Sequence, residues 1–375
     1  MKKVYLDNAS TTSLYPEVIE EMTRILSTQY GNPSSSHEVG REAKNELELA
    51  RKSIAKNLQC NAQEIIFTSC ATEANNLILR SAIKSLEVKR IITSKIEHHA
   101  VLHTVAVLQK EFEIQVDFVS INPDGTINYA HLENLLNSDV KTLVSLMYVN
   151  NEIGTVLDLE KVAHLSKKSN AYFHTDAVQG IGKSVVDLSK ISIDFLVASA
   201  HKFHGPKGVG FAFIKKNIVL EPILYGGEQE KGLRAGTESI HNIVGMAKAL
   251  AISLAHLETN KEYLQGLKKY LVEALKKYFP ESIFVGNPET TQYNIVNIIL
   301  PLEETKSGMI VFLMDMNGVA ISRGSACQSG SSKPSHVLET FIPTEYLAKP
   351  NIRISLSKYN TLDDIDFLIE TIKKL

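Results

Sequence analysis

One lysine stands between two apolar runs that are too short to be helices. Lys202 follows the run Ile193–Ala198 and precedes the run Val209–Ile214, and both runs indicate buried strands. The residues between them are mostly small, with Gly and Pro among them. Removing an amine from water lowers its pKa, and the uncharged amine attacks carbonyl groups. This setting predicts Schiff-base chemistry at Lys202, although a lysine just past a strand end is more often an ordinary surface residue.

An aspartate and a helix start would complete the requirements of one cofactor. Asp176 ends a short strand-like run that begins at Tyr172. Pyridoxal phosphate needs a lysine for its aldehyde and an acid that keeps its pyridine nitrogen protonated. Its phosphate can bind the N–H groups at a helix start. Residues 67–76 indicate such a start, a strand end followed by Thr72, although this segment alone also fits an ordinary helix cap.

A thiol lies in a segment that cannot form regular structure. Residues 323–336 contain five serines, two glycines and one proline, with Cys327 near the middle. This composition excludes a helix or a central strand and predicts a mobile loop. Free cysteines are usually buried, so a cysteine in a polar loop indicates either a nucleophile or an incidental exposed thiol. Gly318 is expected to end a helix over 309–317.

Further motifs carry a family resemblance over essentially the whole chain. In order they are Tyr5–Thr12, Gly31–Ser35, Asn150–Gly154, Gly226–Glu230, Arg234–Glu238 and Ile352–Leu356. With the segments above, they resemble the class V (aminotransferase-like) family of pyridoxal-phosphate enzymes, and most closely the cysteine desulfurases of the housekeeping and nitrogen-fixation type. The resemblance implies the α/β fold of fold-type I pyridoxal-phosphate transferases. We therefore expect a large domain with a mostly parallel, seven-stranded sheet between helices and a smaller α+β domain.

The resemblance also implies a role for each matching residue. The expected catalytic residues are Lys202, Cys327 and His98, which stacks on the cofactor ring and handles protons. The expected cofactor-binding residues are Ala71, Thr72, His98, Asn151, Asp176, Gln179, Ser199, His201, Lys202 and Thr237. Among these, Gln179 is expected at the ring hydroxyl. Arg353 and Asn151 are expected to hold the substrate carboxylate. Thr237 would reach the phosphate of the neighbouring subunit, which implies a homodimer.

The implied reaction removes sulfur from L-cysteine, leaving L-alanine and a persulfide on Cys327. The sulfur would pass to an acceptor protein, either an iron–sulfur scaffold or a tRNA-thiolation enzyme. Selenocysteine lyase and another class V activity, such as an aminotransferase, remain alternatives, although an aminotransferase needs no protein thiol. A non-catalytic sulfur-transfer scaffold is disfavoured because all the cofactor positions are present.

The remaining cysteines and a histidine pair have simpler interpretations. Cys60 lies at an expected helix-to-strand turn and is interpreted as a packing residue. Cys70 stands where the family often carries Gly, and it is interpreted as structural. His99 and His103 have a spacing that zinc ligands use on a helix. No third ligand follows at a fitting spacing, so we expect no metal.

Strand-like runs alternate with helical stretches from about residue 40 to 215, which predicts a parallel sheet with crossover helices. Strands are expected at 64–68, 90–93, 115–119, 142–146, 294–300 and 319–322, and helices at 41–58, 241–257 and the C-terminus. The composition turns charged at 258–262. We therefore expect a large cofactor-binding domain over 14–258, and a small domain from 1–13 and 259–375 that carries the Cys327 loop.

Composition excludes several classes of function. The 375 residues are 44% hydrophobic, enough for full-sized cores, and the net charge of −2 gives no reason to expect nucleic acid or an anionic membrane as a ligand. No apolar run approaches the length of a membrane span, and the basic N-terminus lacks the apolar region of a signal peptide. Three cysteines argue against a disulfide framework. These features predict a cytoplasmic protein.

Overall fold

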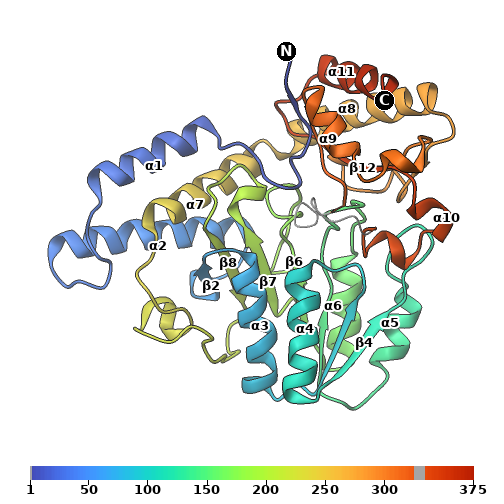
Figure 1. Cartoon of the computed structure of the whole chain (residues 1–375). Coiled ribbons are helices and arrows are strands. Elements are labelled where there is room, and N and C mark those ends of the chain that lie inside the picture. The colour runs from blue at the N-terminus through green and yellow to red at the C-terminus, as the bar shows by residue number, and fades with distance from the viewer. Residues whose placement is uncertain (1, 325–333) are drawn as a thin grey trace.

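A seven-stranded sheet lies at the centre of the larger part of the molecule (Figure 1). The computed structural model describes residues 2–324 and 334–375. The strands run in the order β2 (Ile65–Thr68), β8 (Gly210–Ile214), β7 (Phe195–Ser199), β6 (Tyr172–Asp176), β5 (Thr142–Ser145), β3 (Arg90–Ser94) and β4 (Gln115–Val119). Neighbouring strands from β7 to β4 are parallel, whereas β8 is antiparallel to both β2 and β7. The predicted α/β fold with a mostly parallel sheet is confirmed.

Helices cover both faces of this sheet, as the burial of parallel strands requires. Successive residues of a strand point to opposite faces, so Ile65 and Phe67 join one core and Ile66 joins the other. The helices over the face of Ile66 are α3 (Ala71–Leu86) and α4 (His99–Phe112). Those over the other face are α1 (Pro16–Thr28), α2 (Glu38–Leu58), α5 (Tyr129–Leu136), α6 (Leu159–Lys168) and α7 (Ile240–Ala255).

A second, smaller part lies at the upper right of Figure 1 and contains both chain ends. Its strands are β10 (Ile295–Ile299), which pairs antiparallel with β9 (Ile283–Phe284) and β12 (Asn351–Ser355), and β1 (Val4–Tyr5), which is parallel to β11 (Val319–Ala320). Its helices are α8 (Leu257–Tyr278), α9 (Ile310–Met316), α10 (Thr344–Leu347) and α11 (Leu362–Lys373). The core of this part joins Val4 and Leu6 to residues between 264 and 372. This separate core supports the domain division at residue 258, which we retain as a proposal.

The elements lie within a few residues of their predicted positions. The helix predicted from residue 41 begins at Glu38, because the His37 side chain accepts a hydrogen bond from the Gly40 N–H at 3.2 Å and caps it. The strand predicted over 319–322 has only two residues, and Ser322 forms an isolated bridge with Arg353. Short 3-10 turns complete the described chain at Ala62–Glu64 (η1), Ala200–Lys202 (η2), Gln229–Gly232 (η3), Glu304–Lys306 (η4) and Leu338–Thr340 (η6).

Over residues 2–324 and 334–375, no single helix combines the length and apolar character of a membrane span. The consecutive helices α7 and α8 meet that criterion only as a pair, and they are bent by 70° where they join.

A buried ion pair closes the outer edge of the sheet at β2. The Arg51 guanidinium of α2 donates to both carboxylate oxygens of Glu230, at 2.8 and 2.7 Å, and the two side chains are 5% and 1% exposed. Arg51 also donates to the Ile65 carbonyl at 2.8 Å, and Glu230 accepts from the Phe67 N–H at 2.7 Å. Because an edge strand leaves such backbone groups unpaired, the ion pair replaces the missing neighbour of β2.

Glu230→Gln should strongly destabilise the protein, because it removes the buried carboxylate from Arg51 and leaves only Glu48, a 40% exposed side chain 3.1 Å from the Arg51 Nε atom, as an ionic partner. The expected loss is about 3–5 kcal/mol, measured as a fall in the unfolding midpoint in urea. Arg24→Met is the matched control, since Arg24 is 44% exposed and pairs with Glu21 and Glu46 at the surface. Its loss should stay below about 1 kcal/mol. Equal losses in the two variants would contradict the assigned role of the buried pair.

Candidate active site

A cavity of about 240 Å³ opens where the carboxyl ends of β6 and β7 meet the N-terminal ends of α3 and α4. Ligands of open parallel sheets bind at this edge of the strands. The predicted site residues that line the cavity are Ala71, Thr72, His98, Asn151, Asp176, Gln179, Ser199, His201, Lys202 and Arg353. Residues separated by almost 300 positions in sequence therefore share one cavity.

Lys202 lies in the single turn that follows β7. Its ammonium group donates to the backbone carbonyls of Ala9 at 2.8 Å and Ser10 at 2.6 Å. These carbonyls belong to the loop that connects β1 with α1, so the N-terminal segment forms one wall of the cavity beside the lysine. The amine is thus held inside the cavity rather than extended into solvent.

Asp176, the last residue of β6, is 5% exposed and is held by two hydrogen bonds. One oxygen accepts from the Val178 N–H at 3.1 Å, and the other accepts from the Asn75 side-chain amide at 2.8 Å. Asn75 is fully buried, and its Oδ1 atom has no hydrogen-bond partner among the described residues. Sequence reasoning missed Asn75. Its position one helical turn after Ala71, on the same side of α3, is the signal that could have identified it.

The start of α3 is suited to an anion. Cys70 occupies the N-cap position, and its side chain caps none of the first N–H groups of the helix. The Ala71 N–H donates to the Ser199 hydroxyl at 2.7 Å, which joins the helix start to the end of β7. A Cβ atom on Gly210 would lie 2.5 Å from the Ala198 carbonyl oxygen and 3.0 Å from the Cys70 backbone, so this close approach requires glycine. An uncapped helix start of this kind fits a phosphate group.

Cys70 itself lines the cavity, although the sequence suggested a purely structural residue. Its thiol accepts a weak contact from the Ser69 hydroxyl at 3.7 Å. Cys60, in contrast, packs against the larger core as expected, and burial raises the pKa of its thiol to about 12.

His98 caps α4 and faces the cavity. Its Nδ1 atom accepts from the Ala100 N–H at 3.1 Å, which fixes the ring orientation. Burial lowers the pKa of the imidazole, and this effect exceeds the opposing influence of the Asp176 carboxylate. The ring is therefore uncharged at neutral pH and can accept a proton. His201, which also lines the cavity, has its pKa lowered to about 4, first by burial and then by Lys202.

His99 and His103 stack on one face of α4 with ring centroids 4.6 Å apart. In the part of the chain that the structure describes, no group of three or more His, Cys, Asp or Glu side chains could hold a metal ion. The expectation that the protein uses no metal stays a prediction.

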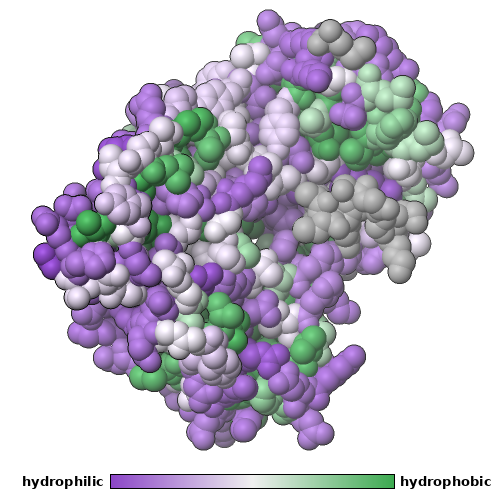
Figure 2. Space-filling model, turned by 60° about the vertical axis from the view of Figure 1, so that its left-hand side comes forward, coloured by the Kyte–Doolittle hydropathy of each residue, from purple (hydrophilic) through white to green (hydrophobic). Residues whose placement is uncertain are grey.

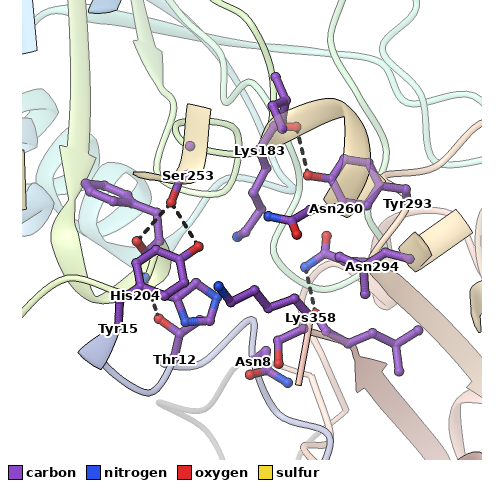
Figure 3. Close-up of a pocket in the computed structure, with 16 residues that line it drawn as sticks. Asn8, Thr12, Tyr15, Lys183, His204, Ser253, Asn260, Tyr293, Asn294 and Lys358 are labelled. Atoms are coloured by element: carbon purple, nitrogen blue, oxygen red, sulfur yellow. Dashed lines mark hydrogen bonds between the residues drawn. The ribbon is translucent and has the colours of Figure 1, made fainter. Parts of the chain in front are cut away.

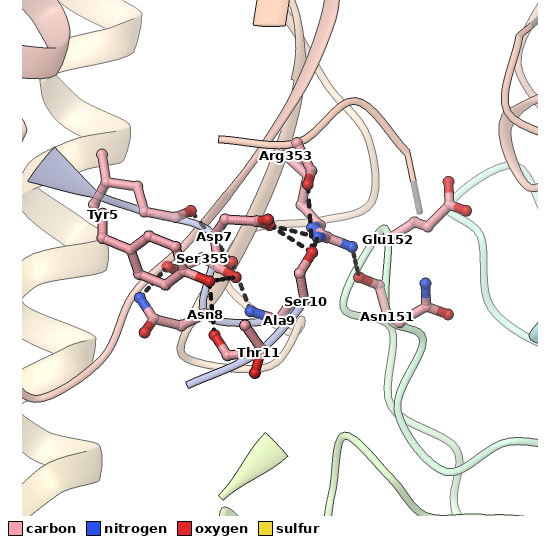
Figure 4. Close-up of polar contacts among 12 residues, drawn as sticks. Tyr5, Asp7, Asn8, Ala9, Ser10, Thr11, Asn151, Glu152, Arg353 and Ser355 are labelled. Atoms are coloured by element: carbon pink, nitrogen blue, oxygen red, sulfur yellow. Dashed lines mark hydrogen bonds and ion pairs between the residues drawn. The ribbon is translucent and has the colours of Figure 1, made fainter. Parts of the chain in front are cut away.

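Arg353, on β12, lines the cavity and is held by polar contacts with the N-terminal segment and Asn151 (Figure 4). Its guanidinium is 1% exposed and donates to the Asn151 carbonyl at 2.8 Å, the Asp7 carboxylate at 2.7 Å and the Ser10 hydroxyl at 2.7 Å. The Nε atom has no partner among the described residues. The Arg353 guanidinium is a planar donor that favours carboxylates, and in this structure the Asp7 carboxylate occupies one of its N–H groups.

The Gln179 side chain is held at both ends of its amide. Its nitrogen donates to the Ala9 carbonyl at 2.7 Å, and its oxygen accepts from the Lys183 ammonium at 2.9 Å. The Ala9 carbonyl oxygen is the same atom that accepts from Lys202. Lys183, which sequence reasoning did not single out, therefore sets the orientation of this amide.

Two predicted site residues are not brought into the cavity of this chain. Thr237 is exposed on the loop before α7 and does not line the cavity. This position agrees with a residue that would serve a neighbouring subunit, a role that stays a prediction. Cys327 lies outside the described residues.

Comparisons with known proteins agree with this geometry. The model of the aminotransferase class-V family matches residues 4–368. The cysteine desulfurase IscS of Dictyoglomus turgidum (strain DSM 6724 / Z-1310) is 38% identical to this chain over 378 residues, covering 100% of this chain and 94% of that protein. A solved NifS-like protein is similar with a TM-score of 0.91 at 36% identity, covering 99% of this chain and 98% of its own. SspA in complex with cysteine has a TM-score of 0.81 at 32% identity, covering 96% and 100%. This chain therefore belongs to the aminotransferase class-V family.

Proposed function

We propose that this protein is a pyridoxal-phosphate-dependent cysteine desulfurase. It converts L-cysteine to L-alanine and retains the sulfur as a persulfide on Cys327. The observation that carries the proposal is the meeting of Lys202, Asp176 and Arg353 in one cavity beside an uncapped helix start. The full-length similarity to cysteine desulfurases and the cysteine complex of SspA support the substrate.

The residues around the cavity fit pyridoxal phosphate, the cofactor of this family. Lys202 supplies the amine for its aldehyde, and Asp176, oriented by Asn75, supplies the acid for its pyridine nitrogen. The start of α3 and Ser199 supply the phosphate donors. When bound, the cofactor acts as an electron sink for the substrate carbon that loses its proton.

Residues of this chain then bind the substrate and transfer protons. Arg353 binds the substrate carboxylate, and the Asp7 carboxylate beside it keeps the guanidinium in place until the substrate arrives. Lys202 and the uncharged His98 are the groups that take and return protons at the substrate carbons.

The sulfur step needs a second nucleophile, which we assign to Cys327. Its thiolate attacks the substrate sulfur, a sulfur–sulfur bond forms, and the electron pair of the Cβ–S bond passes to the substrate carbons. Protonation of those carbons then gives alanine, and no external oxidant or reductant is required. Any acceptor protein, an iron–sulfur scaffold or a tRNA-thiolation enzyme, would take the sulfur from this persulfide.

We also propose that the protein acts as a homodimer. Thr237 lies on an exposed loop that begins near Glu230, whose buried ion pair holds the loop against the sheet edge. Because the loop is anchored at Glu230 and exposed at Thr237, the Thr237 side chain could contact the cofactor phosphate in a second copy of this chain. Size measurement in solution tests this assignment directly.

Lys202→Ala should abolish alanine formation, because the cavity loses both the amine for the cofactor and a proton carrier. We expect the rate to fall at least about a thousandfold, within the range of lost acid–base catalysis. The assay measures alanine released from L-cysteine, together with the cofactor retained after desalting. Lys207, an exposed lysine of the same turn, provides the control: Lys207→Ala should leave the rate of alanine formation and the cofactor content unchanged. Near wild-type rates in Lys202→Ala would refute the assignment.

Arg353→Lys keeps the positive charge but loses the two-pronged geometry, so it should weaken substrate binding. A cost of about 2–3 kcal/mol corresponds to on the order of a hundredfold in kcat/KM for cysteine. Cofactor content should not change, because Arg353 is assigned to the substrate alone. An unaltered kcat/KM would show that the carboxylate binds elsewhere.

Cys327→Ser should stop persulfide formation while leaving cofactor content and melting temperature nearly unchanged. A serine hydroxyl is a poor nucleophile toward sulfur and cannot hold a persulfide. Mass spectrometry after incubation with cysteine should find added sulfur on the Cys327 peptide of the wild type. Cys60→Ser and Cys70→Ser are the controls and should keep this modification. Added sulfur found only on Cys70 would transfer the role to that residue.

A further inference from the structure

A second cavity lies beside the candidate active site, at the seam between the two cores (Figure 3). Tyr15 and Phe203 line it from the larger core, and Leu264 and Tyr293 line it from the smaller core. Its volume is about 40 Å³. Because one water molecule needs roughly 10–15 Å³ on this measure, the cavity accepts a compact group and not an amino acid or a nucleotide.

The charged side chains that line this cavity are positive. Lys183 and Lys358 both line it, and the described residues of its lining include no Asp or Glu side chain. Neither lysine forms an ion pair within the part of the chain that the structure describes. The Lys358 ammonium lies 4.3 Å from the centre of the Tyr15 ring, a contact that leaves its N–H donors available. Glu17 and Glu258 lie near this region but outside the lining.

The surroundings of Lys183 disfavour its positive charge, so a nearby anion would stabilise the ammonium form. Burial, followed by the charges of Lys202 and Arg353, lowers the pKa of the Lys183 ammonium to about 7. Among residues 2–324 and 334–375, one acceptor, Gln179, receives a hydrogen bond from this ammonium group, which carries three donors. Figure 3 shows the Lys183 and Lys358 side chains entering the cavity from the two different parts of the chain.

We propose that this cavity binds a small tetrahedral oxyanion, inorganic sulfate or phosphate, between Lys183 and Lys358. An anion there offsets the like charges of Lys202 and Arg353 that act on Lys183, and it accepts the ammonium donors that the described residues leave unused. The neighbouring side-chain amide of Asn260, which also lines the cavity, adds a neutral donor. The compact volume selects such an ion over larger carboxylates.

Occupancy of this cavity is transmitted to the active site through three hydrogen bonds. Lys183 donates to Gln179, Gln179 donates to the Ala9 carbonyl, and Lys202 donates to the same carbonyl. A bound anion holds Lys183 charged and oriented, and so it fixes the amide of Gln179. The oxyanion therefore acts as an effector that alters the surroundings of Lys202 without touching the substrate.

Calorimetric titration of the fully loaded holoenzyme with sodium sulfate tests the site, because bound cofactor already fills the helix start of α3. Sodium chloride at matched ionic strength serves as the reference. The wild type should bind one sulfate per chain, and Lys358→Met should weaken this binding at least about tenfold, the effect of losing one charge-assisted hydrogen bond. Lys358→Arg should retain it. Equal binding in Lys358→Met, or an equal response to chloride, would overturn the proposal.

The visible absorbance of the bound cofactor tests the link to the active site. Sulfate should change this spectrum in the wild type and should leave it unchanged in Lys183→Met, whose melting temperature verifies that it is folded. Sulfate binding without any spectral change in the wild type would disprove the coupling. Neither measurement uses turnover, so a failure here is distinguishable from a failure of the proposed desulfurase activity.

Discussion

The backbone carbonyl of Ala9 is the contact on which the rest of the site depends. Lys202 and Gln179, which lie on turns beside the seven-stranded sheet, both donate to this one oxygen atom. The nearby residues Asp7 and Ser10 accept from Arg353 of β12. The N-terminal segment is therefore held by side chains from both cores. A shift of this segment would move the amine and the guanidinium together.

This arrangement concentrates positive charge in a buried region. Burial, followed by the charges of Lys202 and Arg353, lowers the pKa of the Lys183 ammonium. Two carboxylates balance part of this charge: Asp176 lines the cavity, and Asp7 pairs with Arg353. Binding of an anionic cofactor and of a substrate carboxylate is favoured by this imbalance. The same excess of positive charge is the reason for proposing an oxyanion site beside Lys183.

The outer edge of the sheet contributes by placing the helix start. The Arg51–Glu230 pair occupies the free backbone groups of β2, and β2 leads directly to the N-terminus of α3. Gly210 in the adjoining strand lets the Cys70 backbone approach closely. These contacts connect the sheet edge directly to the start of α3. They hold the proposed phosphate-binding position in place before a ligand binds, as catalysis requires.

Local sequence by itself determined which residues carry chemistry and on which elements they lie. Lys202 follows a short apolar run and Asp176 ends a strand-like run. Both runs are strands, because a buried strand needs little more than local hydrophobicity and β-branched or aromatic residues. Family motifs supplied the roles expected of His98 and Arg353. The division into domains followed from a change in composition and stays a proposal.

Only the tertiary structure decided how these residues meet. The insertion of antiparallel β8 between β2 and β7, the pairing of Arg353 with Asp7, and the support of Asp176 by Asn75 all join segments far apart in sequence. Such contacts depend on the path of the whole chain and on the side-chain rotamers that packing permits, neither of which local patterns contain. For the same reason the sequence showed Lys183 only as one lysine among many, whereas the fold places it between two cavities.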